Sequence, residues 1–313
     1  MRVLVTGSSG FIGRAVVANL AGLGYEAIGV DRHPKDIPGL ASQMRGDLTD
    51  AGWRAEILEN LVASSDGVIN LAGLLGTAEL LSEIGNAIEA NITAAVDLML
   101  MCRHHDKPMV QISPGNSSWL SVYPITKICA ERLALALGQD AGLKVSIVRA
   151  MNVYGPWQKH APVKKYIPNL IRWAFLGQPA EIYGNGEQMM DVIWVGDVAA
   201  ILVRALEWAR IRTPGTPTVF EAGSGIPLRV NTVADLVWRA VSSAAIMPKI
   251  HVPMRPGEPI ESRTVADPST LYPLGLLPRD LRPFWDGLRE TVAWYRSHPE
   301  ILNLPEHPAA GEH

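Results

Sequence analysis

The sequence has 313 residues, of which 48% are hydrophobic and 19% charged, with a formal net charge of −3. This length allows two domains, or one elaborated domain with a large apolar core. The charge gives no electrostatic reason to expect a nucleic acid or an anionic membrane as partner. The two cysteines, Cys102 and Cys129, show no CxxC or Cys/His spacing, so we expect no disulfide framework, no metal site and a cytoplasmic location.

The N-terminal segment has the pattern of a strand, a glycine-rich turn and a helix. Residues 2–5 form an aliphatic run of strand length, and the apolar residues over 11–23 have helical spacing. Gly7, Gly10 and Gly13 lie at the junction, where glycines let backbone N–H groups approach a phosphate at a helix N-terminus. By itself this pattern also fits a tight turn without a ligand.

An acidic residue follows the second predicted strand. Residues 25–30 end on Asp31, which lies 24 positions after Gly7. A carboxylate at an offset of roughly 20 residues binds the ribose hydroxyls of a dinucleotide, and it favours NAD over NADP because it repels a 2′-phosphate. The neighbouring Arg32 can stack on adenine or soften that preference. The turn and the acid together predict that this half of the chain binds a dinucleotide.

Strands and helices continue to alternate up to residue 112. After a polar, proline-bearing loop, we expect a helix over 50–61, a strand over 68–73, one or two helices over 79–105 and a strand over 109–112. This order predicts a doubly wound parallel sheet with right-handed crossovers. One stripe within 79–105 has i+3/i+4 spacing, which indicates a core face or a dimer face. Its members are Ile84, Ile88, Ile92, Ala95, Met99 and Cys102.

A second chemical signal follows the strand over 109–112. Ser113 stands at the strand end, and beyond a short loop Tyr123 and Lys127 open a helix four positions apart, on one face of it. A phenol titrates near 10, and a nearby cation favours its ionised form. We therefore predict that Tyr123 is a general acid/base, with Lys127 tuning it and able to hold the nicotinamide ribose. A surface pair has the same spacing, but the position after the fourth predicted strand favours catalysis.

The C-terminal half is predicted to alternate as well, with a strand over 219–222 returning to the main sheet. The other expected elements are strands over 144–149, 180–183 and 249–253 and helices over 167–176, 197–208, 232–240 and 283–295. We assign 1–155 to a dinucleotide-binding domain, which 190–230 rejoins. Residues 156–189 and 231–304 are then mainly a substrate domain, and 305–313 are a disordered tail.

These motifs together resemble the extended short-chain dehydrogenase/reductases, in particular the NAD-dependent nucleotide-sugar epimerase/dehydratase group, over residues 1 to about 296. The matching segments are 6–13, Asp31, 46–48, Asn91, Tyr123 with Lys127, 149–156, 183–188, 195–198 and 255–258. The resemblance implies a Rossmann domain with a smaller C-terminal α/β substrate domain, bound NAD and a nucleotide-sugar substrate. It also implies a homodimer through a four-helix bundle built from the helices around 82–105 and 123–138.

The resemblance further implies roles for single residues. Tyr123 and Lys127 are catalytic, Asp47 meets the adenine, and Asn152 and Arg255 contact the nucleotide half of the substrate. The implied cofactor-binding residues are Gly7, Ser9, Gly10, Phe11, Ile12, Gly13, Asp31, Arg32, Asp47, Leu48, Leu71, Ala72, Gly73, Tyr123 and Lys127.

The chain departs from the family first in the loop before Tyr123. Only ten positions separate Ser113 from Tyr123, where the family has a much longer loop over the sugar pocket. Ser113, Ser117 and Ser118 are the candidates for the hydroxyl that polarises the substrate oxygen. We prefer Ser113, because a strand end is the most rigid platform. Asn116 is a candidate without a hydroxyl.

The second departure is Met190, which stands where the family commonly has an arginine that pairs with a substrate phosphate. Arg255, Lys164, Lys165 and Arg172 are the candidates to replace it. The sequence does not choose between them.

The departures bear on the reaction. The 4,6-dehydratases need an Asp-Glu pair beside the strand-end hydroxyl, and the sugar-acid decarboxylases need a nearby Glu, but Pro114 and Gly115 supply no carboxylate. We therefore expect an epimerase that works through a transient keto sugar. A ketosugar reductase or dehydratase of the same family stays an alternative. A non-catalytic dinucleotide-binding regulator is a further one, which the intact Tyr123 and Lys127 argue against.

Overall fold

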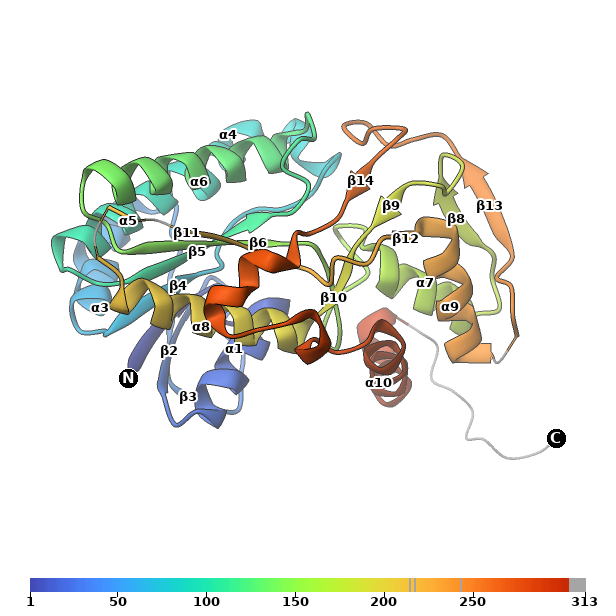
Figure 1. The fold of residues 1–313 in the computed structure, drawn as a ribbon, viewed down its shortest axis with the longest axis horizontal. Helices are drawn as coiled ribbons and strands as arrows, with labels where there is room; N and C mark the ends of the chain where they lie inside the picture. Colours follow the sequence, from blue (N-terminus) through green and yellow to red (C-terminus); the bar gives the residue numbers. More distant parts are fainter. Residues whose placement is uncertain (214, 217, 243, 304–313) are drawn as a thin grey trace.

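The computed structural model describes residues 1–213, 215–216, 218–242 and 244–303, so the predicted disordered tail lies outside the described residues. A parallel sheet with helices on both faces occupies one end of the molecule, and a smaller α/β region lies beyond the carboxyl ends of its strands (Figure 1). Within the described ranges, every helix is too short or too polar to cross a membrane.

The main sheet has seven strands in the order β11-β6-β5-β4-β1-β2-β3, and neighbouring strands pair in parallel. Its strands are β1 (Arg2–Thr6), β2 (Glu26–Asp31), β3 (Leu40–Arg45), β4 (Gly67–Asn70), β5 (Met109–Pro114), β6 (Val145–Ala150) and β11 (Thr218–Ala222). The predicted doubly wound parallel sheet is thus confirmed, and so is the return of residues 219–222 to it. The sheet order reverses between β4 and β1, which is where α/β sheets of this type place their ligands.

Strand β3 corrects the prediction of a loop after Asp31. It lies at the edge of the sheet, and its side chains are mostly exposed or half-buried. An edge strand that buries so little needs no apolar run. Its sequence therefore carried no strand signal.

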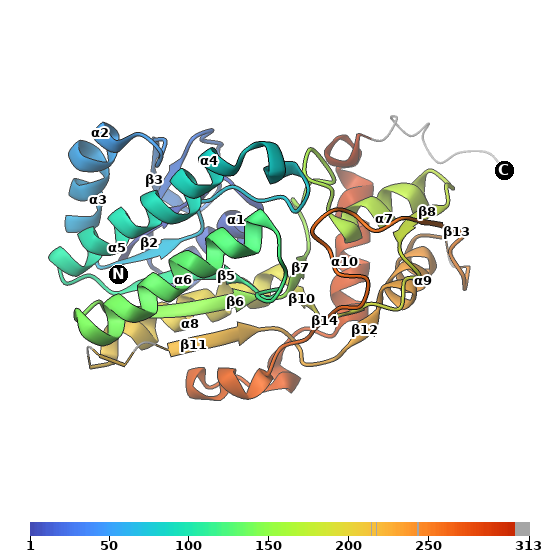
Figure 2. The same ribbon diagram turned by 90° about the horizontal axis from the view of Figure 1, so that it is seen from above.

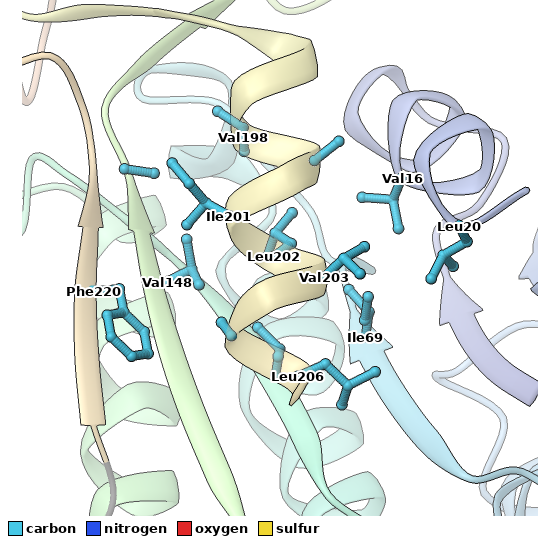
Figure 3. Close-up of a cluster of buried hydrophobic side chains, with 14 of the residues drawn as sticks. Val16, Leu20, Ile69, Val148, Val198, Ile201, Leu202, Val203, Leu206 and Phe220 are labelled. Atoms are coloured by element: carbon cyan, nitrogen blue, oxygen red, sulfur yellow. The ribbon is translucent and has the colours of Figure 1, made fainter. Parts of the chain in front are cut away.

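Side chains alternate between the two faces of the sheet. Val3 and Val5 on β1 belong to the core between the sheet and helices α1 (Phe11–Gly22) and α8 (Val195–Ile211). Leu4 belongs to the core on the opposite face of the sheet. Figure 3 shows α8 packed on the sheet, with Ile201, Leu202 and Leu206 among its buried side chains. Apolar side chains of α1, among them Val16 and Leu20, belong to the same core (Figure 3).

The opposite face carries the helices that precede β4, β5 and β6 in the chain (Figure 2). They are α2 (Ala51–Trp53), the π-helical turn η1 (Arg54–Leu58), α3 (Glu59–Ala63), α4 (Ile84–Ile88), the π-helical turn η3 (Glu89–Thr93), α5 (Ala94–His104) and α6 (Val122–Asp140). The turn η3 divides the predicted apolar stripe, because a π-helical turn holds an extra residue and rotates the helical residues after it. Ile84 and Ile88 are 49% and 45% exposed, whereas Ala95, Met99 and Cys102 are buried in the core.

The C-terminal region is built from short strands and three longer helices. Its strands are β7 (Asn152–Tyr154) with β10 (Val192–Trp194), β8 (Ala180–Tyr183) with β13 (Lys249–Val252), and β9 (Met189–Met190) between β12 (Leu228–Arg229) and β14 (Arg263–Thr264). Its helices are α7 (Tyr166–Phe175), α9 (Val230–Ser242) and α10 (Phe284–Ser297), with 3₁₀ turns η2 (Glu79–Ser82), η4 (Pro268–Leu274), η5 (Pro278–Asp280) and η6 (Pro299–Leu302) elsewhere in the chain. A third apolar core, which includes Tyr154, Leu170 and Tyr295, holds α7, α9 and α10 together.

Candidate active site

A cavity of about 810 Å³ is lined by residues from both the sheet and the C-terminal region. Its lining includes the glycine turn after β1, the residue that ends β2, the start of α6 and the segment around Arg255. The carboxyl ends of β1, β4 and β5 therefore face the cavity where the sheet order reverses.

The glycine turn brings the start of α1 close to the end of β1. Gly7 has a φ of +69°, and its N–H donates to the carbonyl of Val30 at 2.8 Å. A Cβ on Gly13 would lie 2.2 Å from the carbonyl oxygen of Gly7, so only glycine allows this approach. No side chain caps α1 at Gly10, which leaves its first backbone N–H groups to an anion in the cavity.

Two carboxylates face the same part of the cavity. Asp31 accepts hydrogen bonds from the backbone N–H of Ser9 at 3.0 Å and of His33 at 2.9 Å. Asp47 accepts from the N–H and the hydroxyl of Thr49 at 2.9 and 2.8 Å. Burial alone would raise the pKa of its carboxyl, but these bonds together with the charges of Arg32 and His33 lower it. The other predicted cofactor residues here also line the cavity: Ser9, Phe11, Ile12, Arg32 and Leu48.

A chain of buried polar groups orders the ends of the central strands. The Thr6 hydroxyl donates to the Asn70 side chain at 2.6 Å, and the Asn70 amide donates to Gln111 at 2.7 Å. Thr6 also accepts from the backbone N–H of Ala72 at 3.2 Å, which positions the 71–73 segment along the cavity. The sequence analysis did not predict this series of hydrogen bonds, because its members come from three different strands.

Asn91 fixes the continuation of that segment. Its side chain accepts from the N–H of Leu74 and donates to the carbonyl of the same residue, both at 2.9 Å, and it donates to Thr126 on α6 at 3.0 Å. A Cβ on Gly73 would lie 2.7 Å from Nζ of Lys127. The loop after β4 is therefore held against the helix that carries the predicted catalytic pair.

Tyr123 reaches the cavity from the first turn of α6, and Lys127, one turn later, lies behind the cavity wall formed by Ala72. The Lys127 ammonium donates to the carbonyl of Ala72 at 3.1 Å, and Tyr123 lines the cavity wall. Burial lowers the pKa of Lys127 to about 8 and raises the pKa of Tyr123 to about 12. Such shifted groups in a cavity are typical of proton-transfer sites.

Ser113 is occupied by a buried ionic network. Its hydroxyl donates at 2.5 Å to Glu131, which is fully buried on α6 and also pairs with Arg149 on β6. Arg149 pairs in turn with Glu221 on β11 at 3.4 Å. The network ties α6 to the sheet. The sequence shows no signal for it, since its members lie far apart in the chain.

The residues after the strand end differ in what they offer the cavity. A side chain at Gly115 would meet the sulfur of Met151 at 2.3 Å. Asn116 lines the cavity, whereas Ser117 and Ser118 are exposed and do not. Of these three residues, Asn116 is therefore the one placed to offer a polar side chain to the cavity.

Asn152 and Met190 line the cavity from the C-terminal region. The Asn152 amide donates to the carbonyl of Asp191 at 2.9 Å. Asp191 itself is fully buried and accepts from four donors on the segments around residues 224 and 266. It anchors the strand β9, so its role here is structural.

A cluster of charged and aromatic side chains closes the cavity near β8. Arg255 pairs with Glu258 and lies 5.2 Å from the ring centre of Tyr183. Lys164 donates to Glu181 at 2.6 Å and to the Tyr183 hydroxyl at 3.0 Å. The Nε of Arg255 is buried without a hydrogen-bond partner in the described part of the chain, and the residue lines the cavity.

The glycine turn, the uncapped helix and Asp31 fit the diphosphate and ribose of a dinucleotide. The comparison with protein families agrees: the model of the NAD dependent epimerase/dehydratase family matches residues 3–223. The chain belongs to that family. It is accordingly an NAD-dependent enzyme.

Known relatives align with nearly the whole chain. The chain is 29% identical to a dTDP-glucose 4,6-dehydratase of Mycobacterium tuberculosis (strain CDC 1551 / Oshkosh), over 95% of the chain and 94% of that protein. It is 29% identical to the solved structure of MoeE5 in complex with UDP-glucose and NAD, covering 96% and 100% with a TM-score of 0.81. A UDP-N-acetylglucosamine 4-epimerase from Methanobrevibacter ruminantium M1 shares the fold, at 24% identity and a TM-score of 0.83 over 95% and 98%.

As a member of this family, the chain combines expected and unexpected features. All predicted cofactor residues except Lys127 line the cavity, and Lys127 touches its wall through Ala72. The predicted substrate residues Asn152 and Arg255 line it too. Ser113 lines it as well, but its hydroxyl hydrogen is directed to Glu131.

Proposed function

We propose that this enzyme epimerises the sugar of a nucleotide-activated sugar through a transient keto form. The observation that carries the proposal is where the carboxylates of the cavity lie. In the described part of the chain, those that line it are Asp31 and Asp47 by the glycine turn, and Glu181 and Glu258, which pair with Lys164 and Arg255. Glu181 and Glu258 are engaged in these ion pairs, and Pro114 and Gly115 at the strand end add no carboxylate, so we expect no acid/base pair for removing water from the sugar.

Tyr123 is the proton-transfer group in this proposal. Its ionised phenolate oxygen takes the proton of a substrate hydroxyl as the ring carbon becomes a ketone, and the resulting phenol returns that proton after the sugar has presented its other face. Lys127 follows one turn later on the same face of α6, and its positive charge favours the phenolate. When bound, NAD accepts and returns the two electrons of the reaction.

The group that polarises the substrate oxygen is assigned here to Asn116. Asn116 lines the cavity next to Gly115, whereas the Ser113 hydroxyl hydrogen is engaged by Glu131. A neutral amide can donate a hydrogen bond to the developing ketone oxygen without exchanging a proton. The geometry therefore favours Asn116 over Ser113 for this role.

Arg255 is proposed to bind the diphosphate of the substrate in place of an arginine at position 190. Its buried Nε lacks a partner, and its ring contact with Tyr183 holds the guanidinium at the cavity wall. Lys164 and Lys165 also line the cavity, whereas Arg172 donates to the carbonyl of Leu302 at 3.0 Å. Arg172 is thus committed to the fold.

A panel of UDP- and dTDP-sugars, followed by NMR of the products, tests the proposal. We expect inversion at one ring carbon, a need for only catalytic NAD and no net rise in NADH absorbance near ~340 nm. A 4-keto-6-deoxy product would show a dehydratase, the activity named for the relative from Mycobacterium tuberculosis. Stoichiometric NADH, or a need for NADPH, would show a dehydrogenase or a ketoreductase.

Replacing Tyr123 by Phe tests the mechanism. We expect Tyr123→Phe to keep the fold and NAD binding but to lower turnover by about 10²–10⁴-fold, since one hydroxyl carries the proton. Circular dichroism and NAD titration provide the controls. Turnover above a tenth of the wild-type rate would contradict the assignment.

A further inference from the structure

The segment after Gly155 leaves the C-terminal region and lines the cavity together with the glycine turn. We call residues 155–160 the strap. Trp157, Gln158 and Lys159 of the strap line the same cavity as Ser9 and Asp31. A segment of the substrate-binding half thus reaches the part of the cavity that fits the dinucleotide.

The strap is held from behind by side chains of α7 and α10. The buried Tyr295 hydroxyl donates to the carbonyl of Gln158 and, at 3.5 Å, to that of Gly155. Asn169 donates to the carbonyl of His160 at 3.0 Å. These bonds fix the path of the backbone along the cavity.

Trp157 is the anchor of the strap. Its φ is +71°, a conformation that a bulky side chain adopts only when its surroundings impose it. The Arg14 guanidinium lies 4.3 Å from the centre of its ring, and the Trp294 ring centre lies 4.9 Å away. The indole therefore joins α1, which carries the glycine turn, to α10.

Three cationic residues, Arg14, Lys35 and Lys159, line the same cavity as Ser9. Arg14 donates from Nε to the Ser9 carbonyl at 3.3 Å, and the backbone N–H of Lys35 donates to the Ser9 hydroxyl at 3.1 Å. The charge of Lys159 is the largest cause of a lowered pKa at Lys35, with burial and Arg14 adding to it and Asp31 opposing it. In the described ranges, none of the three cations forms an ion pair within 4 Å of a carboxylate. An anion placed between these like charges would reduce their mutual repulsion.

We infer that the strap is a fixed clamp on the cofactor, in which Lys159, with Arg14 and Lys35, holds the diphosphate of NAD against the start of α1. This inference rests on the proposed function, because an epimerase needs the same NAD to stay bound through both half-reactions. The clamp slows the release of NAD and links its retention to the half of the molecule that binds the sugar.

The test compares NAD binding in the full-length enzyme and in variants that differ by one charge. Calorimetry gives the affinity, and rapid dilution into a scavenger of free NAD gives the dissociation rate. We expect Lys159→Ala to weaken NAD binding by about tenfold or more, as for a lost charge-assisted hydrogen bond, mainly through faster dissociation. Lys159→Arg should restore most of the affinity. Lys144→Ala, which removes a charge paired with Asp106 at 2.8 Å, is the matched control and should change nothing.

Trp157→Gly distinguishes the contribution of the Trp157 indole to NAD retention from that of the Lys159 charge. Glycine accepts a φ of +71°, so this variant keeps the backbone conformation but loses the indole. We expect faster release of NAD although Lys159 is intact. An unchanged release rate would show that the strap is not held by Trp157 and would overturn that part of the inference.

NADP identifies the phosphate that is held. Equal losses of NAD and NADP affinity in Lys159→Ala support a contact with the shared diphosphate, whereas a loss for NADP alone would place Lys159 at the 2′-phosphate and overturn the inference. Unchanged NAD affinity and release in Lys159→Ala would also overturn it, while leaving epimerisation intact. Failure of the wild-type enzyme to bind NAD would instead refute the proposed function.

Discussion

Lys127 is buried behind the cavity wall, with 4% of its surface exposed, and this burial lowers its pKa from 10.5 to about 8. The folded, cofactor-free protein thus releases this proton near pH 8, whereas the unfolded chain keeps it until about pH 10.5. The free energy of unfolding consequently rises with pH between these values, by up to about 3 kcal/mol at about 1.4 kcal/mol per pH unit. Below pH 8 the buried ammonium destabilises the fold by that amount.

We expect Lys127→Met to abolish turnover and yet raise the Tm of the cofactor-free protein at pH 7. The reason is that methionine replaces a buried charged side chain with an uncharged one of similar length. The difference from the wild type should shrink as the pH rises above 8. Thermal unfolding at pH 7, 8 and 9.5 measures it. A variant less stable than the wild type at every pH would show that the bond to Ala72 outweighs the burial of the charge.

Substitutions of Asn116 and Ser113 should differ in whether they change kcat or the stability of the fold. We expect Asn116→Ala to lower kcat by about 10²-fold at unchanged Tm, since it removes a donor to the reacting oxygen. Ser113→Ala should instead destabilise the fold by about 1–3 kcal/mol, because Glu131 loses a buried donor, with little change in kcat. Ser117→Ala, at an exposed position, is the control. A large kcat loss in Ser113→Ala at unchanged Tm would return the role to Ser113.

At the scale of the element, α1 offers a matched pair of glycines at its two ends. A Cβ at Gly13 would lie 2.2 Å from a backbone oxygen, whereas a Cβ at Gly22 meets nothing within 4 Å. We expect Gly13→Ala to lower the Tm and abolish NAD binding by forcing the helix away from the turn. Gly22→Ala should bind NAD normally and be as stable as the wild type or up to about 1 kcal/mol more stable. Normal NAD titration of Gly13→Ala would contradict a phosphate site at this turn.

At the scale of the whole molecule, we propose a homodimer through the outer face of α4 and α6. The exposed fractions of Ile84, Ile88, Ile125 and Leu133 there are 49%, 45%, 53% and 39%. A group of large apolar side chains exposed on one face is typical of a protein–protein interface. We expect light scattering to give twice the mass of one chain, and Ile125→Glu to give the monomer. Ile211→Glu, on a more exposed isoleucine at the end of α8, is the control. A monomeric wild type would refute the dimer.

The local part of the site follows from the sequence alone. A strand, three glycines and a helix, an acid at the end of the next strand, and Tyr123 four positions before Lys127 are each specified within a few residues, where spacing and geometry are directly linked. The alternation of apolar runs and helical patterns likewise determined the parallel sheet, because each buried strand requires apolar residues on both of its faces. The family resemblance rested on these same short segments.

Tertiary structure decided the contacts that depend on residues far apart in the chain. Glu131 captures the Ser113 hydroxyl only because α6 packs on β5, and Lys159 lines the same cavity as Lys35 only because the strap reaches the glycine turn. The strand β3 and the division of the 84–102 stripe were also settled there, by an edge position that needs no apolar run and by a π-helical turn that shifts the helical phase. The physical reason is common to all four: a side chain's spacing along the chain determines which face it occupies, but only the packing of that face determines what it meets.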